Sequence, residues 1–118
     1  MDTNAFSANL RQEDHMIVID LVGSINAQAD QVFNQAYHAA DSMNSETIAL
    51  NFSGVDYINS TGIALIVGLL AEARKSHKRL VVYGLSEHYL EIFQITRLSD
   101  FMDIFDNETS AVEVGISS

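Results

Sequence analysis

Residues 53–62 have the sequence SGVDYINSTG and lie between two apolar runs. The preceding run, at residues 48–52, has the short length of a buried strand, and the following run, at residues 63–73, has the length of a helix. We therefore expect this stretch to be a polar loop that joins a strand to a helix. Unpaired first-turn amides and the helix dipole favour negative charge at such a helix start. Ser60 and Thr61 are thus suited both to cap the helix and to carry a phosphate.

The composition is that of a single globular domain. The chain has 118 residues, of which 47% are apolar and 19% charged, so residues 1–118 can bury one sizeable core. It contains no cysteine, which excludes disulfides, thiolate metal ligands and a cysteine nucleophile. This agrees with a reducing compartment, and we predict a cytoplasmic protein.

The charge of the chain argues against nucleic acid as a ligand. Six Lys and Arg stand against 16 Asp and Glu, which gives a formal net charge of −10, and only residues 74–79 form a small basic cluster. Residues 1–10 lack the pattern of a signal peptide, and the longest apolar stretch is far shorter than the ~20 residues of a membrane span. No membrane association is expected. The four histidines fall in different elements without ligand spacing, so no metal site is expected.

The apolar periodicity predicts alternating strands and helices after an N-terminal hairpin. The strands are expected at residues 6–12, 16–22, 47–52, 80–83 and 101–105, and the helices at 28–43, 63–77, 87–95 and 107–114. We expect Gly23 to stop the second strand, and Asn26 or Asp30, Ser86 and Asp106 to cap helices. The order ββαβαβαβα predicts an α/β domain with a mixed, mostly parallel sheet of four to five strands and about four helices.

The helix after the focal stretch is apolar nearly all round in its first half. A helix that packs against a sheet needs only one apolar stripe, so the surplus side chains are either deeply buried or face a partner. Ile63, Ile66, Val67 and Leu70 therefore fit both a core and an interface role.

Residues 50–63, with the sequence LNFSGVDYINSTGI, resemble the core motif of STAS domains, and specifically of the small bacterial anti-sigma-factor antagonists. Further matches are GSIN at residues 23–26, LVVYGLS at 80–86 and FQITRL at 93–98. The resemblance covers residues 8–113 and implies a single STAS-like domain.

The resemblance also implies a function in partner switching. Such an antagonist binds an anti-sigma factor that is also a serine kinase, which phosphorylates it and thereby releases it, and a PP2C-type phosphatase resets the cycle. The phosphoacceptor of the family corresponds to Ser60, with Thr61 as the weaker candidate, and Asn59, Thr61 and Gly62 form its environment. The residues assigned to partner binding are Ser24, Asn26, Tyr57, Ile58, Ile63, Ile66 and Val67. We expect the amides of Thr61, Gly62 and Ile63 to accept the phosphate.

One residue departs from the family pattern, because Asn59 stands where the family has Asp. Asparagine keeps the size and hydrogen-bonding capacity of aspartate but not its charge. If the carboxylate positions or activates the hydroxyl, phosphorylation of Ser60 is slow or lost. If it repels the incoming phosphate, Asn59 removes that repulsion.

Other functions fit the sequence less well. The chain has no nucleophile elbow, dinucleotide-binding motif or P-loop and no base near Ser60 in sequence, so we expect no enzyme, no catalytic residue and no cofactor. A phosphoaspartate receiver with Asp56 would need an acidic pair after the first strand and a late lysine, which are missing. Some STAS domains bind nucleotides, but no phosphate-cradling glycine run supports this here. The remaining alternative is a non-phosphorylated STAS binding module in a larger signalling or transport assembly.

Overall fold

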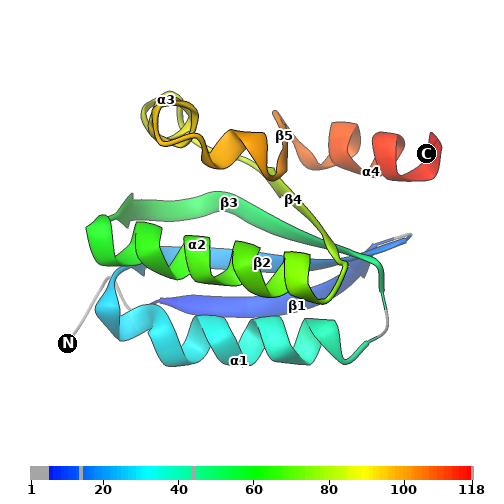
Figure 1. The fold of residues 1–118 in the computed structure, drawn as a ribbon, viewed down its shortest axis with the longest axis horizontal. Helices are drawn as coiled ribbons and strands as arrows, with labels where there is room; N and C mark the ends of the chain where they lie inside the picture. The colour runs from blue at the N-terminus through cyan, green and yellow to red at the C-terminus, as the bar shows by residue number, and fades with distance from the viewer. Residues whose placement is uncertain (1–5, 14, 44, 118) are drawn as a thin grey trace.

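The computed structural model describes residues 6–13, 15–43 and 45–117. Figure 1 shows the sheet with helices on both sides. The elements in chain order are β1 (Ser7–Glu13), β2 (Met16–Ile25), the 3₁₀ turn η1 (Ala27–Ala29), α1 (Asp30–Asp41), β3 (Thr47–Ile58), α2 (Ser60–Lys75), β4 (Arg79–Tyr83), α3 (Glu87–Ile95), the 3₁₀ turn η2 (Leu98–Asp100), β5 (Asp103–Phe105) and α4 (Glu108–Ser117).

The sheet has the spatial order β1-β2-β3-β4-β5. β1 and β2 form an antiparallel hairpin at one edge, and the three pairings from β2 to β5 are parallel. This confirms the α/β class and the mixed, mostly parallel sheet. β3 is the central strand and the longest of the five, and it leads directly into α2.

The core lies on the two faces of this sheet. The larger apolar cluster joins one face to α1, α2 and α3, and Phe33, Ile66 and Phe93 from these helices are fully buried in it. The smaller cluster lies on the other face, where Ala111 of α4 packs over residues such as Val18 and Val81. Alternate strand residues therefore point to opposite helical layers, which explains the apolar runs of the parallel strands.

The prediction that the second strand stops at Gly23 is wrong, because β2 continues to Ile25. Gly23 adopts a φ of 102°, a left-handed conformation that glycine takes without steric cost. Next to it β2 shifts register against β3 twice, between Asp20 and Val22 and between Gly23 and Ser24. The glycine thus marks a bulge inside the strand rather than its end.

The prediction of a polar loop after Phe52 is also wrong, because β3 continues to Ile58. Residues 54–58 pair with β2, whereas β4 ends opposite Asn51. This half of β3 therefore has a neighbouring strand on one side only. Its polar residues, such as the exposed Asp56, reflect a free strand edge and not a loop.

Several helix caps differ from the expected ones. Ser86 caps α3 as predicted, since its side chain accepts a hydrogen bond from the first turn. Asn26 caps the 3₁₀ turn η1 and not an α-helix, accepting from the amide of Gln28 at 2.9 Å. α4 is capped by Asn107 and not by Asp106, because the Ser110 amide donates to the Asn107 side chain at 2.9 Å.

Some element boundaries also move. α1 ends at Asp41 instead of Met43, and α2 ends at Lys75. β5 begins at Asp103, because residues 101–102 form a bend after η2. η2 itself follows Arg97, which has a φ of 66°. These are end effects of one or two residues and leave the order of elements unchanged.

Arg11 on β1 ties the edge hairpin to α4 through ion pairs across the sheet. Its Nε lies 2.5 Å from Asp20 and its Nη2 lies 2.7 Å from Glu108. Tyr83 donates to the same Glu108 carboxylate at 2.7 Å, and Asn51 donates to Asp20 at 2.8 Å. The Arg11 guanidinium holds the pKa values of both carboxyls below their usual range. Because the two lowered pKa values belong to the folded state, this stabilisation exists above the unfolded-state pKa values and is lost as the pH falls.

We therefore expect the free energy of unfolding to decrease between about pH 6 and about pH 3, and to decrease less steeply in Arg11→Met. Urea denaturation at a series of pH values measures both slopes. Arg97→Met is the matched control, because the Arg97–Asp100 pair is a surface pair with the arginine side chain 79% exposed. An unchanged pH slope in Arg11→Met would contradict this account of the network.

Candidate functional site

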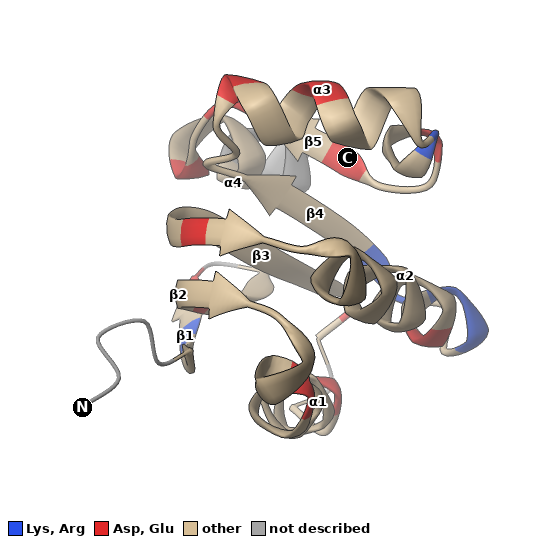
Figure 2. Cartoon of the chain, turned by 90° about the vertical axis from the view of Figure 1, so that its left-hand side faces the viewer, with Lys and Arg blue, Asp and Glu red and all other residues tan. Residues whose placement is uncertain are grey.

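The candidate site lies where β3 passes into α2. In Figure 2 the ends of β2 and β3 lie on the side that faces the viewer, next to the α2 helix. A single residue, Asn59, separates the two elements. Its backbone amide donates to the carbonyl of Ile25, at the end of β2, at 3.2 Å. Its backbone carbonyl accepts from the amide of Ile63 at 2.9 Å. The turn is therefore anchored to the neighbouring strand and to the helix at the same time.

Asn59 is the N-cap of α2. Its side-chain oxygen accepts a hydrogen bond from the Gly62 amide at 2.8 Å, the geometry of a helix N-cap. The prediction that Ser60 or Thr61 caps the helix is therefore wrong. Both are exposed residues of the first turn, and neither hydroxyl has a hydrogen-bond partner among the residues that the structure describes.

The anion-binding capacity of the helix start is shifted by one residue from the expected position. The Gly62 amide is taken by the Asn59 side chain, and the Ile63 amide is taken by the Asn59 carbonyl. The amides of Ser60 and Thr61 have no intrahelical acceptor, because they belong to the first turn. These two amides, beside the two free hydroxyls, are the groups that can accept an anion here.

Gly62 allows α2 to start in direct contact with β2. It is buried, and a Cβ added there would lie 2.1 Å from the carbonyl oxygen of Ile25 and 2.9 Å from the Ile58 side chain. No side chain fits at these distances. The glycine is therefore required by the close approach of the helix to the strand end.

The residues predicted for partner binding divide into exposed and buried ones. Tyr57 and Val67 are 55% and 44% exposed, and Asn26 and Ile63 are partly exposed. The other three are buried, at 8% exposure or less, so they support the surface from below and do not fit as contact residues: Ser24, Ile58 and Ile66. Direct partner contact stays a prediction for the first four.

Two exposed residues of α2 extend this surface and were not among the seven residues assigned to partner binding. Ala64 and Gly68 follow Ser60 at intervals of four residues, so they lie on the same side of the helix, and both are exposed. A Cβ added to Gly68 would meet no atom within 4 Å. The spacing of small residues after Ser60 was the signal in the sequence that could have found them.

Tyr89 of α3 is a further residue near the site that was not predicted. It is buried, and its hydroxyl accepts a hydrogen bond from the amide of Ile58 at 2.9 Å. About 30 positions separate the two residues in the chain, so local sequence pattern carried no signal for this contact. The ring of His88 packs edge-on against Tyr89, with centroids 4.8 Å apart.

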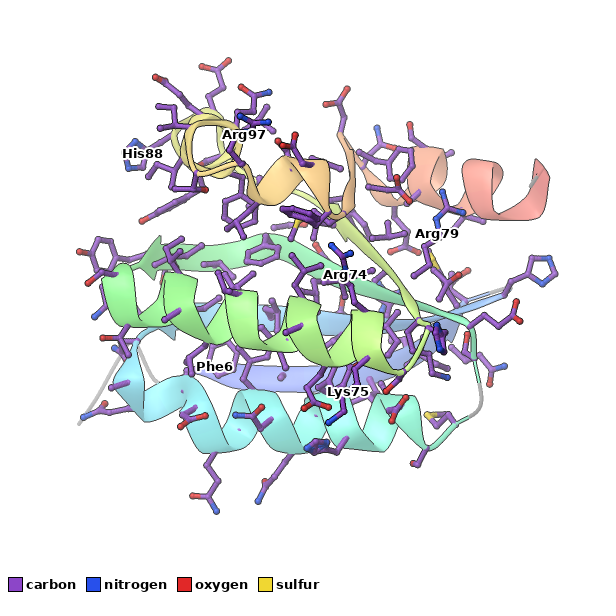
Figure 3. The ribbon with its side chains drawn as sticks, viewed as in Figure 1. Phe6, Arg74, Lys75, Arg79, His88 and Arg97 are labelled. Atoms are coloured by element: carbon purple, nitrogen blue, oxygen red, sulfur yellow. The ribbon has the colours of Figure 1, made fainter. Side chains whose placement is uncertain are left out.

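The largest group of basic side chains lies at the opposite end of α2. There a cavity of about 460 Å³ is lined in part by Arg74, Lys78 and Arg79. Arg79 pairs with Asp103 at 2.6 Å, and Arg74 lies over the Phe101 ring at 4.9 Å from its centroid. Figure 3 shows Arg74 pointing away from α2, and places Lys75 and Arg79 at the same end of the molecule. Arg74 and Arg79 are thus engaged locally, and the whole group lies far from Ser60.

Two further findings concern metal ligands and membrane-spanning helices. Within residues 6–13, 15–43 and 45–117, no group of three His, Cys, Asp or Glu side chains could hold a metal ion. In the same part of the chain, no helix combines the length and the apolar character that a membrane crossing requires.

Comparisons with known proteins place these features in a family context. A family model described as "Mlab, STAS domain" matches residues 8–104. The anti-sigma-B factor antagonist of Listeria monocytogenes is 31% identical over 94 residues, which cover 80% of this chain and 82% of that protein. The anti-sigma-B factor antagonist of Staphylococcus epidermidis is 38% identical over 66 residues, which cover 56% of this chain and 59% of that protein.

Solved structures share the fold. An anti-sigma factor antagonist from Mycobacterium paratuberculosis has a TM-score of 0.82 at 14% identity, with 96% of each chain covered. The anti-sigma factor antagonist SpoIIAA in its unphosphorylated form has a TM-score of 0.71 at 19% identity, with 97% of this chain and 99% of that chain covered. At these identities the likeness shows the fold alone.

We predict that Gly62→Ala destabilises the protein by about 1–3 kcal/mol, because its Cβ would overlap the Ile25 carbonyl. Gly68→Ala is the matched control in the same helix. It should stabilise the protein by about 0.5–1 kcal/mol, since alanine is the better helix former and its Cβ meets nothing. Urea denaturation measures both changes. Equal effects of the two substitutions would show that the contact with β2 is not the constraint.

Proposed function

The chain belongs to the STAS domain family, and we propose that it is an anti-sigma-factor antagonist whose release from its partner is driven by phosphorylation of Ser60. The partner is an anti-sigma factor that is also a serine kinase. The observation that carries the proposal is the capping of α2 by Asn59. Because the cap is supplied by another residue, the exposed Ser60 hydroxyl is left without a structural task.

The surface around Ser60 is suited to docking a protein. Tyr57 at the end of β3 and Val67 on α2 are large exposed apolar groups. The small exposed residues Ala64 and Gly68 allow a partner backbone to approach α2 closely. Docking there places the Ser60 hydroxyl against the kinase.

The phosphoryl transfer is balanced by ATP held on the kinase. The Ser60 Oγ attacks the γ-phosphorus, the bond from that phosphorus to the β–γ bridging oxygen breaks, and ADP leaves. The hydroxyl proton passes to a base of the kinase or to water. The PP2C-type phosphatase then reverses the state of the chain, since water attacks the phosphorus and inorganic phosphate leaves with the Ser60 hydroxyl restored.

The added phosphate is tolerated by the free chain and disfavoured in the complex. It brings roughly −1.5 to −2 charges, which the first-turn amides of Ser60 and Thr61 can accept. At a docked surface the same dianion is desolvated against groups that do not pair with it. A loss of about 4 kcal/mol lowers affinity roughly a thousandfold, so one modification suffices as a switch.

Asn59 replaces the aspartate of the family, which could either slow phosphorylation of Ser60 or remove repulsion against the incoming phosphate. Its side-chain oxygen is committed to the Gly62 amide, so an aspartate in the same rotamer would also spend one oxygen on the cap. The side-chain NH₂ group of Asn59 adds a hydrogen-bond donor where aspartate would place a negative charge beside the incoming phosphate. Both points support phosphorylation of Ser60 with asparagine at this position.

Asn59 is also the reason for keeping a second candidate function. A carboxylate that activates the hydroxyl would be missing here, and the chain would then be a non-phosphorylated STAS binding module in a larger signalling or transport assembly. The same surface of α2 would dock its partner, but without release. The two functions differ in whether phosphate reaches Ser60 at all.

We predict that a kinase of the anti-sigma-factor type from the same genome, supplied with ATP, phosphorylates this chain at Ser60, as located by mass spectrometry. Ser60→Ala should abolish the label and Thr61→Ala should retain it. Ser60→Glu should weaken binding to the kinase by about a hundredfold or more. Its melting temperature should not fall, because a carboxylate is favourable in the first turn of a helix. If the chain binds the kinase but is not phosphorylated, and Ser60→Glu binds as tightly as the wild type, the non-phosphorylated binding module is the remaining function.

A second prediction concerns the departure from the family pattern. We expect Asn59→Asp to change the phosphorylation rate by less than about tenfold, because aspartate retains the cap of α2. A tenfold change corresponds to about 1.4 kcal/mol. Asn59→Ala is the control for the cap and should lower the free energy of unfolding by about 1 kcal/mol. Steady-state kinetics and urea denaturation measure the two effects. A gain of several hundredfold in Asn59→Asp would show instead that the missing carboxylate limits the reaction.

A further inference from the structure

The second half of β3 lacks a neighbouring strand on the side of β4. β4 ends at Tyr83, which pairs with Asn51, and the chain then turns away at Gly84 with a φ of 81°. The strand nevertheless continues to Ile58, which directly precedes the cap Asn59 and the proposed phosphoacceptor Ser60. The backbone groups of Ile58 on that side therefore need another partner.

A side chain from α3 supplies that partner. The Tyr89 hydroxyl accepts from the Ile58 amide at 2.9 Å and lies 3.4 Å from the Ile58 carbonyl, to which it donates. Ile58 is 5% exposed and Tyr89 is 9% exposed, so both partners of these bonds are buried. One hydroxyl thus satisfies both main-chain groups of Ile58, as a neighbouring strand would.

The packing around this bond is incomplete. A small cavity of about 120 Å³ lies between the free edge of β3 and the segment that leads into α3. It is lined by Phe52, Ser53, Val55, Ile58, Gly84, Leu85, Ser86 and Tyr89. Side-chain contact alone therefore does not clamp the end of β3 from this side, and the hydroxyl is the polar tie between the strand end and α3.

We propose that Tyr89 is a positioning residue for the phosphoswitch, and that its hydroxyl couples α3 to the presentation of Ser60. Fixing Ile58 fixes the next residue, Asn59, whose side chain holds the Gly62 amide and thereby the first turn of α2. The kinase part of this inference rests on the proposed function. The coupling itself is a property of the free chain, and it is reciprocal, so a change at Ser60 must also be felt at α3.

The test compares Tyr89→Phe with Tyr83→Phe. Both substitutions remove one hydroxyl from a buried ring, but the Tyr83 hydroxyl bonds Glu108 at 2.7 Å on the face covered by α4 and not the end of β3. Amide hydrogen exchange is followed by NMR at equal distance from each melting temperature. We expect the Gly62 amide to exchange about tenfold faster in Tyr89→Phe, a change of about 1.4 kcal/mol in the opening equilibrium, and to be unaffected in Tyr83→Phe. Equal protection of the Gly62 amide in the two variants would overturn the inference.

Two further measurements separate this inference from the proposed function. Ser60→Glu should alter the exchange of α3 amides in the wild-type background and not in Tyr89→Phe; the same response in both backgrounds would overturn the coupling. With the kinase, Tyr89→Phe should lower kcat/KM about tenfold and Tyr83→Phe should leave it unchanged. If local exchange rises while kcat/KM stays the same, Tyr89 does not position the acceptor. If the wild-type chain is never phosphorylated, the proposed function fails while the two exchange measurements still decide the coupling.

Discussion

The close contact between the first turn of α2 and the carbonyl of Ile25 is the constraint on which the site depends. That carbonyl accepts the amide of Asn59, and it lies where any side chain at position 62 would place its Cβ. Gly62 is therefore required so that the helix can start against the end of β2. A helix that starts there has its first turn at the carboxyl edge of the parallel strands, where ligand sites of α/β folds usually lie.

Capping by Asn59 then determines the chemistry that is left over. The side chain of an asparagine immediately before the helix can reach forward to the Gly62 amide, whereas Ser60, as the first helical residue, cannot fill the role of the cap. The separation of the two tasks leaves an exposed hydroxyl on a rigid helix start. A mobile loop could also carry a phosphoacceptor, but it would not offer two preoriented amides to the phosphate.

The order of elements could be predicted from the sequence, because it depends on local apolar patterns. The candidate site was inferred from the resemblance of residues 50–63 to the STAS motif, and its role stays a prediction. The extension of β3 to Ile58 could not be predicted, because its polar residues have the composition of a loop and only pairing with β2 makes them a strand. The Tyr89 bond and the Arg11 ion pairs join residues distant in the chain, so they follow from the fold and not from any local pattern.

The distribution of charge decides how a phosphate on Ser60 can act. Four of the six basic residues lie within residues 74–79, at the far end of a helix that spans about 22 Å from Ser60 to Lys75. This distance exceeds the Debye length of about 8 Å at physiological ionic strength, so their charges are largely screened at Ser60. The other two, Arg11 and Arg97, are held in ion pairs with carboxylates. The phosphate would then be accepted by backbone amides and not neutralised by a side chain of its own domain, so its charge remains available to act on the docked partner.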